Sequence, residues 1–101
     1  MINSLIIGFG NRAKQTVIPA LQVINEGKIF VFSRNFEKLD NQKGKYGIEP
    51  IKTLNNEVLK NINKIFLCVP SKDFLSIIKN ISKHNPGWIN LFIDTPIYVN
   101  I

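Results

Sequence analysis

The stretch Leu5-Ile6-Ile7-Gly8-Phe9-Gly10-Asn11-Arg12-Ala13 decides the fold of this 101-residue chain. An apolar run is followed by a G-x-G-x-x-A turn, and a helical pattern begins at the alanine. Gly8 permits a tight turn, Gly10 leaves room for a pyrophosphate to approach the backbone, and Ala13 lets the helix lie close to the strand. The N–H groups at the start of the helix attract phosphates. A strand, this turn and a helix in that order predict a dinucleotide-binding site, to which Phe9, Asn11 and Arg12 also belong.

Outward from this turn, short apolar runs alternate with helical patterns along the chain. We expect strands at 5–7, 29–32, 48–51, 65–69 and 89–93, and helices over 13–24, 36–46, 54–62 and 71–84. Because the strands are apolar on both faces, they should pair in parallel and be covered on both sides. The predicted fold class is therefore α/β: a doubly wound, Rossmann-like parallel sheet of five strands in the order 3-2-1-4-5, with helices on both faces.

Two of the predicted helices carry breaks in their pattern. The helix over 13–24 should bury one face, whose members are Ala13, Val17, Ala20, Leu21 and Ile24. Pro19 has no N–H group, so it removes the hydrogen bond to Gln15 and should bend this helix. The segment over 36–46 can be capped by Asn35, but Gly44 and Gly47 interrupt it. We expect that second helix to be short or frayed.

Length and composition are those of a single folded domain spanning residues 1–101. Hydrophobic residues make up 45% of the chain and charged residues 20%, which argues against disorder. No apolar run approaches the ~20 residues that cross a bilayer, and the N-terminus lacks the features of a signal peptide. A single cysteine, Cys68, excludes an internal disulfide and is typical of a reducing compartment. We expect a cytoplasmic protein with no membrane partner.

The net charge of +6 raises the question of a nucleic-acid partner. The lysines are scattered along the chain, however, and do not form the clustered patch that is typical of nucleic-acid binders. We therefore expect solvated lysines and no nucleic-acid partner.

The end of the second strand selects the dinucleotide. An Asp or Glu about 20 residues after the glycine turn usually binds the ribose 2′-hydroxyl of NAD. Here Ser33 and Arg34 stand at that position, and neither is acidic. Arg34 can form charge-assisted hydrogen bonds with a 2′-phosphate, and Ser33 can donate another. The sequence therefore favours NADP over NAD as the cofactor.

The remaining titratable residues give no clear catalytic or metal site. One cysteine and one histidine, His84, stand too far apart to predict a metal site. Ser71 can cap the helix over 71–84, and Asp73 in its first turn is expected to act as a helix N-terminal charge. Asp94 follows the last strand, near the predicted crevice, and is the better functional candidate.

Four stretches together resemble a known family: "GFGNRAKQTVIPAL", "VFSRN", "IFLCVPS" and "LFIDTPIY". Over residues 5–98 the chain looks like the N-terminal NAD(P)-binding domain of the glucose–fructose oxidoreductase / inositol dehydrogenase (Gfo/Idh/MocA) family. The resemblance implies an oxidoreductase that acts on sugars or related polyols. It also implies that Val69 and Pro70 line the cofactor at the end of the fourth strand.

The chain departs from this family at its C-terminal end. The family motif Glu-Lys-Pro corresponds to Asp94-Thr95-Pro96, and Thr95 cannot supply the ammonium of the family lysine. The family's C-terminal substrate domain has no counterpart before Ile101. We therefore expect a truncated or incomplete oxidoreductase without turnover of its own, partnered by a second copy or by a separate substrate-domain chain. The alternative is a non-enzymatic nucleotide-binding or interaction module.

Overall fold

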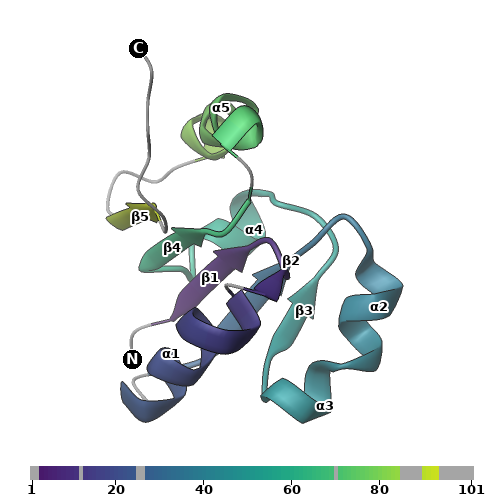
Figure 1. The fold of residues 1–101 in the computed structure, drawn as a ribbon. Helices are drawn as coiled ribbons and strands as arrows, with labels where there is room; N and C mark the ends of the chain where they lie inside the picture. Colours follow the sequence, from purple (N-terminus) through teal and green to yellow (C-terminus); the bar gives the residue numbers. More distant parts are fainter. Residues whose placement is uncertain (1–2, 12, 25–26, 70, 85–89, 94–101) are drawn as a thin grey trace.

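Five parallel strands form one sheet, which confirms the predicted α/β fold (Figure 1). The computed structural model describes residues 3–11, 13–24, 27–69, 71–84 and 90–93. The strands run in the predicted order, β3-β2-β1-β4-β5. Their bounds are β1 Ser4–Ile7, β2 Ile29–Phe32, β3 Glu49–Ile51, β4 Lys64–Leu67 and β5 Asn90–Ile93. The central strand β1 therefore pairs with β2 on one side and with β4 on the other.

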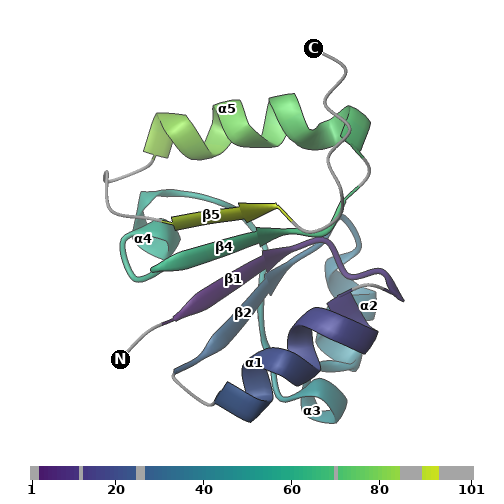
Figure 2. The same ribbon diagram turned by 60° about the vertical axis from the view of Figure 1, so that its left-hand side comes forward.

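Helices cover both faces of the sheet, and Figure 2 shows α1 and α5 on opposite sides of it. The helical segments are η1 Ala13–Val17, α1 Ile18–Ile24, α2 Phe36–Asn41, α3 Lys43–Tyr46, α4 Asn56–Leu59, η2 Ser71–Asp73 and α5 Phe74–His84. Here η1 is a π-helix and η2 a 3₁₀ turn. The α-helix predicted from Ser71 thus begins three residues later, at Phe74, because a 3₁₀ turn comes first.

The core has two halves, one on each face of the sheet. Leu5 and Ile7 of β1 pack with Ile65 and Leu67 of β4, beneath α4 and α5. Ile6 points to the opposite face, where it joins a cluster that includes residues of η1, α1 and α2. Successive strand residues face opposite sides, so a strand buried between two helical layers must be apolar throughout. This is why β1 has no polar residue after Ser4.

The first helix keeps only part of the predicted face: Ala13 and Val17 are buried and Leu21 packs against the core, whereas Ala20 and Ile24 are exposed. It begins as the π-helix η1, and only its continuation α1 is α-helical. A π turn accommodates an extra residue, which rotates the following side chains by about 100°. Ile18 is therefore 1% exposed, whereas Ile24, which the α-helical spacing places on the buried face, is 53% exposed.

The segment over 36–46 forms two short helices, but the division is at Gln42 and not at Gly44, which lies within α3. Asn35 caps α2, with its side-chain oxygen accepting a hydrogen bond from the Lys38 N–H at 3.1 Å. Gln42 separates α2 from α3, and Gly47 ends α3 in the left-handed conformation, at φ 64°. A glycine adopts this conformation without steric penalty, which explains its place at the helix end.

Asn3 connects the amino ends of the three central strands. Its side-chain oxygen accepts a hydrogen bond from the Lys28 N–H, just before β2, at 3.0 Å. Its side-chain nitrogen donates to the Asn61 carbonyl at 3.0 Å, and its own N–H donates to the Asn63 side chain at 3.0 Å. One polar residue thus satisfies backbone groups of the chain entering β1, β2 and β4.

Candidate dinucleotide-binding site

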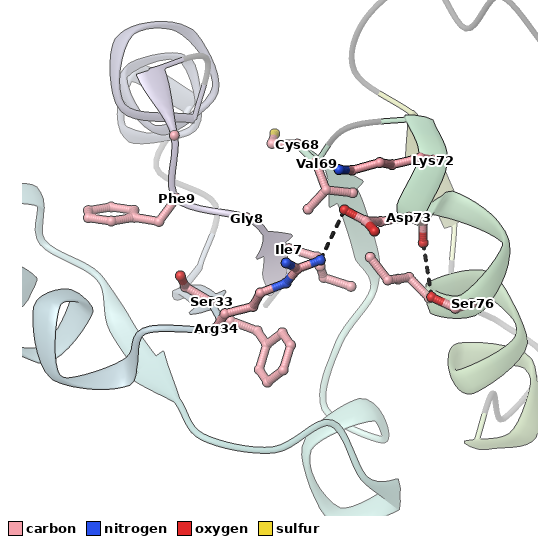
Figure 3. A pocket seen from close by; sticks show the side chains of 13 residues that line it. Ile7, Gly8, Phe9, Ser33, Arg34, Cys68, Val69, Lys72, Asp73 and Ser76 are labelled. Atoms are coloured by element: carbon pink, nitrogen blue, oxygen red, sulfur yellow. Dashed lines mark hydrogen bonds and ion pairs between the residues drawn. The ribbon is translucent and has the colours of Figure 1, made fainter.

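A cavity of about 510 Å³ opens at the carboxyl ends of β1, β2 and β4 (Figure 3). This is the position expected for a ligand in a doubly wound sheet, where the strand order reverses. Six of the residues predicted to bind the cofactor line it: Gly8, Phe9, Gly10, Ser33, Arg34 and Val69. The fold therefore brings together side chains from three separate strand ends that only the topology makes neighbours.

Gly8 lies where the three strand ends converge. Its N–H donates to the Phe32 carbonyl at 2.8 Å, while the Cys68 N–H donates to the Ile7 carbonyl at 2.8 Å. Its φ is 109°, in the region that only glycine adopts readily. A Cβ at this position would lie 2.8 Å from the Cys68 carbonyl carbon and 2.9 Å from Val69 Cγ1. Gly8 is thus required by the protein's own packing.

Gly10 lines the same cavity but is not crowded. A Cβ built on Gly10 would meet no atom within 4 Å. Among the described residues, nothing in the packing excludes a side chain at this position. The open space beside Gly10 matches the space that a pyrophosphate needs when it approaches the backbone of such a turn. The residues present therefore fit a dinucleotide at this end of the cavity.

The other residues of the turn have different surroundings. Ala13 is fully buried in the core beside Ile6, as its predicted packing role requires. Asn11 is exposed and is not among the residues that line the cavity. The predicted binding residues Arg12 and Pro70 lie outside the described residues, as do the catalytic candidates Asp94 and Thr95.

Phe9 contributes to the cavity wall while its ring packs elsewhere. In Figure 3 the ring points away from Asp73. It makes an edge-to-face contact with Tyr46 of α3, with ring centroids 5.4 Å apart, and the Lys14 ammonium lies 4.8 Å from its centroid. The contact with Tyr46 links the glycine turn to α3.

Arg34 and Asp73 form an ion pair at the cavity. Arg34 Nη2 lies 3.1 Å from Asp73 Oδ2, and both residues line the cavity. Figure 3 shows the guanidinium extending from the end of β2 to the start of α5. The sequence predicted only that Asp73 stabilises the start of a helix. Its contact with Arg34, the residue predicted to bind the 2′-phosphate, was not predicted. Ser33 beside Arg34 is half-buried, and its hydroxyl accepts a hydrogen bond from the Asn35 N–H at 3.4 Å.

Sequence reasoning missed the wall that η2 and α5 contribute. Besides Asp73, this wall includes Lys72, Ser76 and Ile77. The signal was present in part, because Lys72 and Asp73 follow β4 closely and the carboxyl ends of parallel strands meet at one edge of the sheet. Ser76 and Ile77 lie one helical turn further on, and no strand-end rule identifies them.

Two further predictions concern absences. Within the part of the chain that the structure describes, no group of three or more His, Cys, Asp or Glu residues could hold a metal ion. None of the described helices is long and apolar enough to cross a bilayer.

Residues 5–95 match the model of a protein family described as "NADP oxidoreductase coenzyme F420-dependent". The chain belongs to this family. It is an NADP-binding Rossmann domain of the oxidoreductase type, so the cofactor predicted from the end of β2 agrees with the family. The match does not specify the Gfo/Idh/MocA family that the sequence motifs resemble.

Solved structures with a similar fold are oxidoreductases of low sequence identity. A 3-ketoreductase from Actinomadura kijaniata in complex with NADP and TDP-benzene superposes with a TM-score of 0.75 at 16% identity, over 94% of this chain and 29% of its own. Saccharopine dehydrogenase from Saccharomyces cerevisiae gives 0.71 at 17%, over 96% and 22%. Glycerol-3-phosphate dehydrogenase from Coxiella burnetii gives 0.68 at 15%, over 91% and 31%.

These similarities establish the fold. The chain spans less than a third of the length of these three solved structures. No curated protein matches the sequence.

Proposed function

We propose that residues 1–101 form one domain, the cofactor-binding unit of an NADP-dependent oxidoreductase whose substrate is held by a further domain or a separate chain. The observation that carries this proposal is the cavity at the carboxyl ends of β1, β2 and β4, with open space beside Gly10 and a guanidinium at the end of β2. NADP(H), when bound, supplies hydride transfer, and the residues of this chain bind and orient it.

The two ends of the cavity have separate tasks in this proposal. The glycine turn receives the pyrophosphate against its backbone at Gly10. Arg34 and Ser33, at the end of β2, receive the adenosine 2′-phosphate. A guanidinium offers paired N–H donors to a phosphate, and such charge-assisted hydrogen bonds are about twice as strong as neutral ones. The end of β2 itself carries no acidic residue of the kind that binds the ribose 2′-hydroxyl of NAD.

For the substrate, we favour a sugar or a related polyol. The support is the resemblance of the sequence motifs to the Gfo/Idh/MocA family. The family description instead names coenzyme F420. Turnover assays of the complete enzyme with a keto sugar and with reduced F420 distinguish the two.

As the partner we propose a second copy of the chain or a separate substrate-domain chain. Sedimentation of the purified chain measures the association directly.

Calorimetric titration of the chain with NADPH and NADH tests the cofactor assignment. We expect tighter binding of NADPH, and Arg34→Asp should reverse the preference by roughly 1–3 kcal/mol, the range for hydrogen bonds to charged groups. Lys60→Asp is the matched control, because it makes the same charge change on a residue that does not line the cavity. Equal affinities for both cofactors, unchanged in Arg34→Asp, would contradict the assignment.

A further inference from the structure

We propose that Asp73 lowers the selectivity of this chain for NADP over NAD, because its carboxylate competes with the cofactor's 2′-phosphate for Arg34. This inference rests on the proposed function. The choice between NAD and NADP is usually set by residues at the end of β2. Here we assign an effect on that choice to Asp73, which lies on the opposite side of the cavity, next to α5.

The first step of the argument is the position of the ion pair. Arg34 follows β2, whereas Asp73 ends η2, the turn that follows β4. Because β1 lies between β2 and β4 in the sheet, the 3.1 Å contact between these side chains spans the carboxyl end of β1. Figure 3 shows Ile7 and Gly8 of that strand end beside the bridge. The pair therefore crosses the cavity in which the dinucleotide is proposed to lie.

The second step is the unequal exposure of the two partners. The Arg34 side chain is 85% exposed, and that of Asp73 is 22% exposed. The Asp73 carbonyl also accepts a hydrogen bond from the Ser76 hydroxyl at 3.3 Å, within the start of α5. The hydrogen bond holds the backbone of Asp73 and the low exposure of its side chain restricts the carboxylate, while the guanidinium is largely in solvent. Arg34 is the partner that can turn to another anion.

The third step is the chemistry of the exchange. Carboxylates and phosphates both accept hydrogen bonds from the N–H edges of a guanidinium, so the Nη2 group that Arg34 gives to Asp73 is not free for a phosphate. A 2′-phosphate that takes both Nη donors of Arg34 therefore draws the side chain away from Asp73. NAD carries no 2′-phosphate and leaves the pair intact. Asp73 consequently weakens the binding of NADP but has no matching effect through Arg34 on NAD.

Asp73→Asn tests this inference, with the ratio of the NADP and NAD affinities as the readout. Removal of a negative charge near the pyrophosphate favours both cofactors alike, so the ratio isolates the effect on the 2′-phosphate. We expect the ratio to rise by roughly two- to fivefold, the scale of an exposed ion pair. Asp40→Asn is the control: it removes an equal charge from the ion pair between Asp40 of α2 and Lys43 of α3, outside the cavity lining, and should leave the ratio unchanged.

A double-mutant cycle identifies Arg34 as the intermediary. In an Arg34→Gln background, Asp73→Asn should no longer change the ratio. The ratio of the affinities for adenosine 2′,5′-bisphosphate and adenosine 5′-monophosphate, which differ only in the 2′-phosphate, should change in the same way. If the unaltered chain binds neither dinucleotide, the proposed function itself fails. If the chain binds NADP but Asp73→Asn leaves the ratio unchanged or lowers it, Asp73 does not compete and the inference is overturned.

Discussion

At Gly8 and Gly10, one motif needs glycine for two different physical reasons. Gly8 combines a φ of 109° with backbone and side-chain atoms of β4's end packed against it. Gly10 has neither constraint within the described structure, and open space lies where its side chain would be. Gly8 therefore serves the fold, whereas we propose that Gly10 leaves space for the cofactor.

These two roles predict opposite outcomes for substitution. Gly10→Val should abolish binding of NADPH and leave the thermal unfolding midpoint nearly unchanged, since its side chain would fill only open space. Gly8→Ala should lower the free energy of unfolding by about 1–3 kcal/mol, because strained φ and overpacking each have effects of that size. Thermal unfolding and calorimetric titration of both variants measure the two effects. Normal cofactor binding by Gly10→Val would mean that the turn is structural only.

At the scale of elements, the ends of the strands are held by different means. Their carboxyl ends meet at the cavity, whereas their amino ends are connected through Asn3. Its side chain makes hydrogen bonds to backbone groups at Lys28 and Asn61, which precede β2 and β4. The hydrogen bonds of Asn3 therefore hold the amino ends of the three central strands together, at the end of the sheet opposite the cavity.

Asn3→Ala should destabilise the chain without changing cofactor preference. Two side-chain hydrogen bonds are lost, and each contributes roughly 0.5–1.5 kcal/mol in a partly exposed setting. Chemical denaturation measures the loss. Asn80→Ala is the control, because Asn80 lies exposed on α5 and has no side-chain hydrogen bond among those found in the described residues. Equal stability of the Asn3 variant and the unaltered chain would show that these bonds contribute nothing net.

At the scale of the whole molecule, the described residues that line the cavity come from one sheet and from the helix beside it. The cavity is lined by β1, β2, β4 and the start of α5. In the described structure no second layer faces it to hold a substrate against a nicotinamide. Hydride transfer needs the two reactants held in close and correct alignment.

The chain alone should therefore bind NADPH and yet show no turnover of keto sugars or polyols. Absorbance at the nicotinamide band follows oxidation of NADPH, and calorimetry on the same sample confirms that the cofactor is bound. Measurable turnover by the purified chain would overturn the view that a second domain or chain must complete the site.

Much of the fold was predictable from local patterns. The short apolar runs predicted the strands. Because a parallel sheet buried on both faces requires strands of this kind, the same runs also predicted the parallel pairing and the helices on both faces. Asn35 and Gly47 marked helix ends through their own hydrogen bonding and φ. The cofactor-selecting position after β2 was found from its distance along the chain to the turn.

Other features depend on contacts between residues far apart in the chain. The π turn of η1 left Ala13 and Val17 buried but placed Ile18 in the core and Ile24 in solvent, because burial depends on packing against the sheet as well as on helical spacing. The ion pair of Arg34 with Asp73 links the carboxyl ends of β2 and β4, which come close to each other because both strands pair with β1. Local propensity is encoded within a few residues, whereas the partner of a charged side chain is set by how the whole sheet assembles.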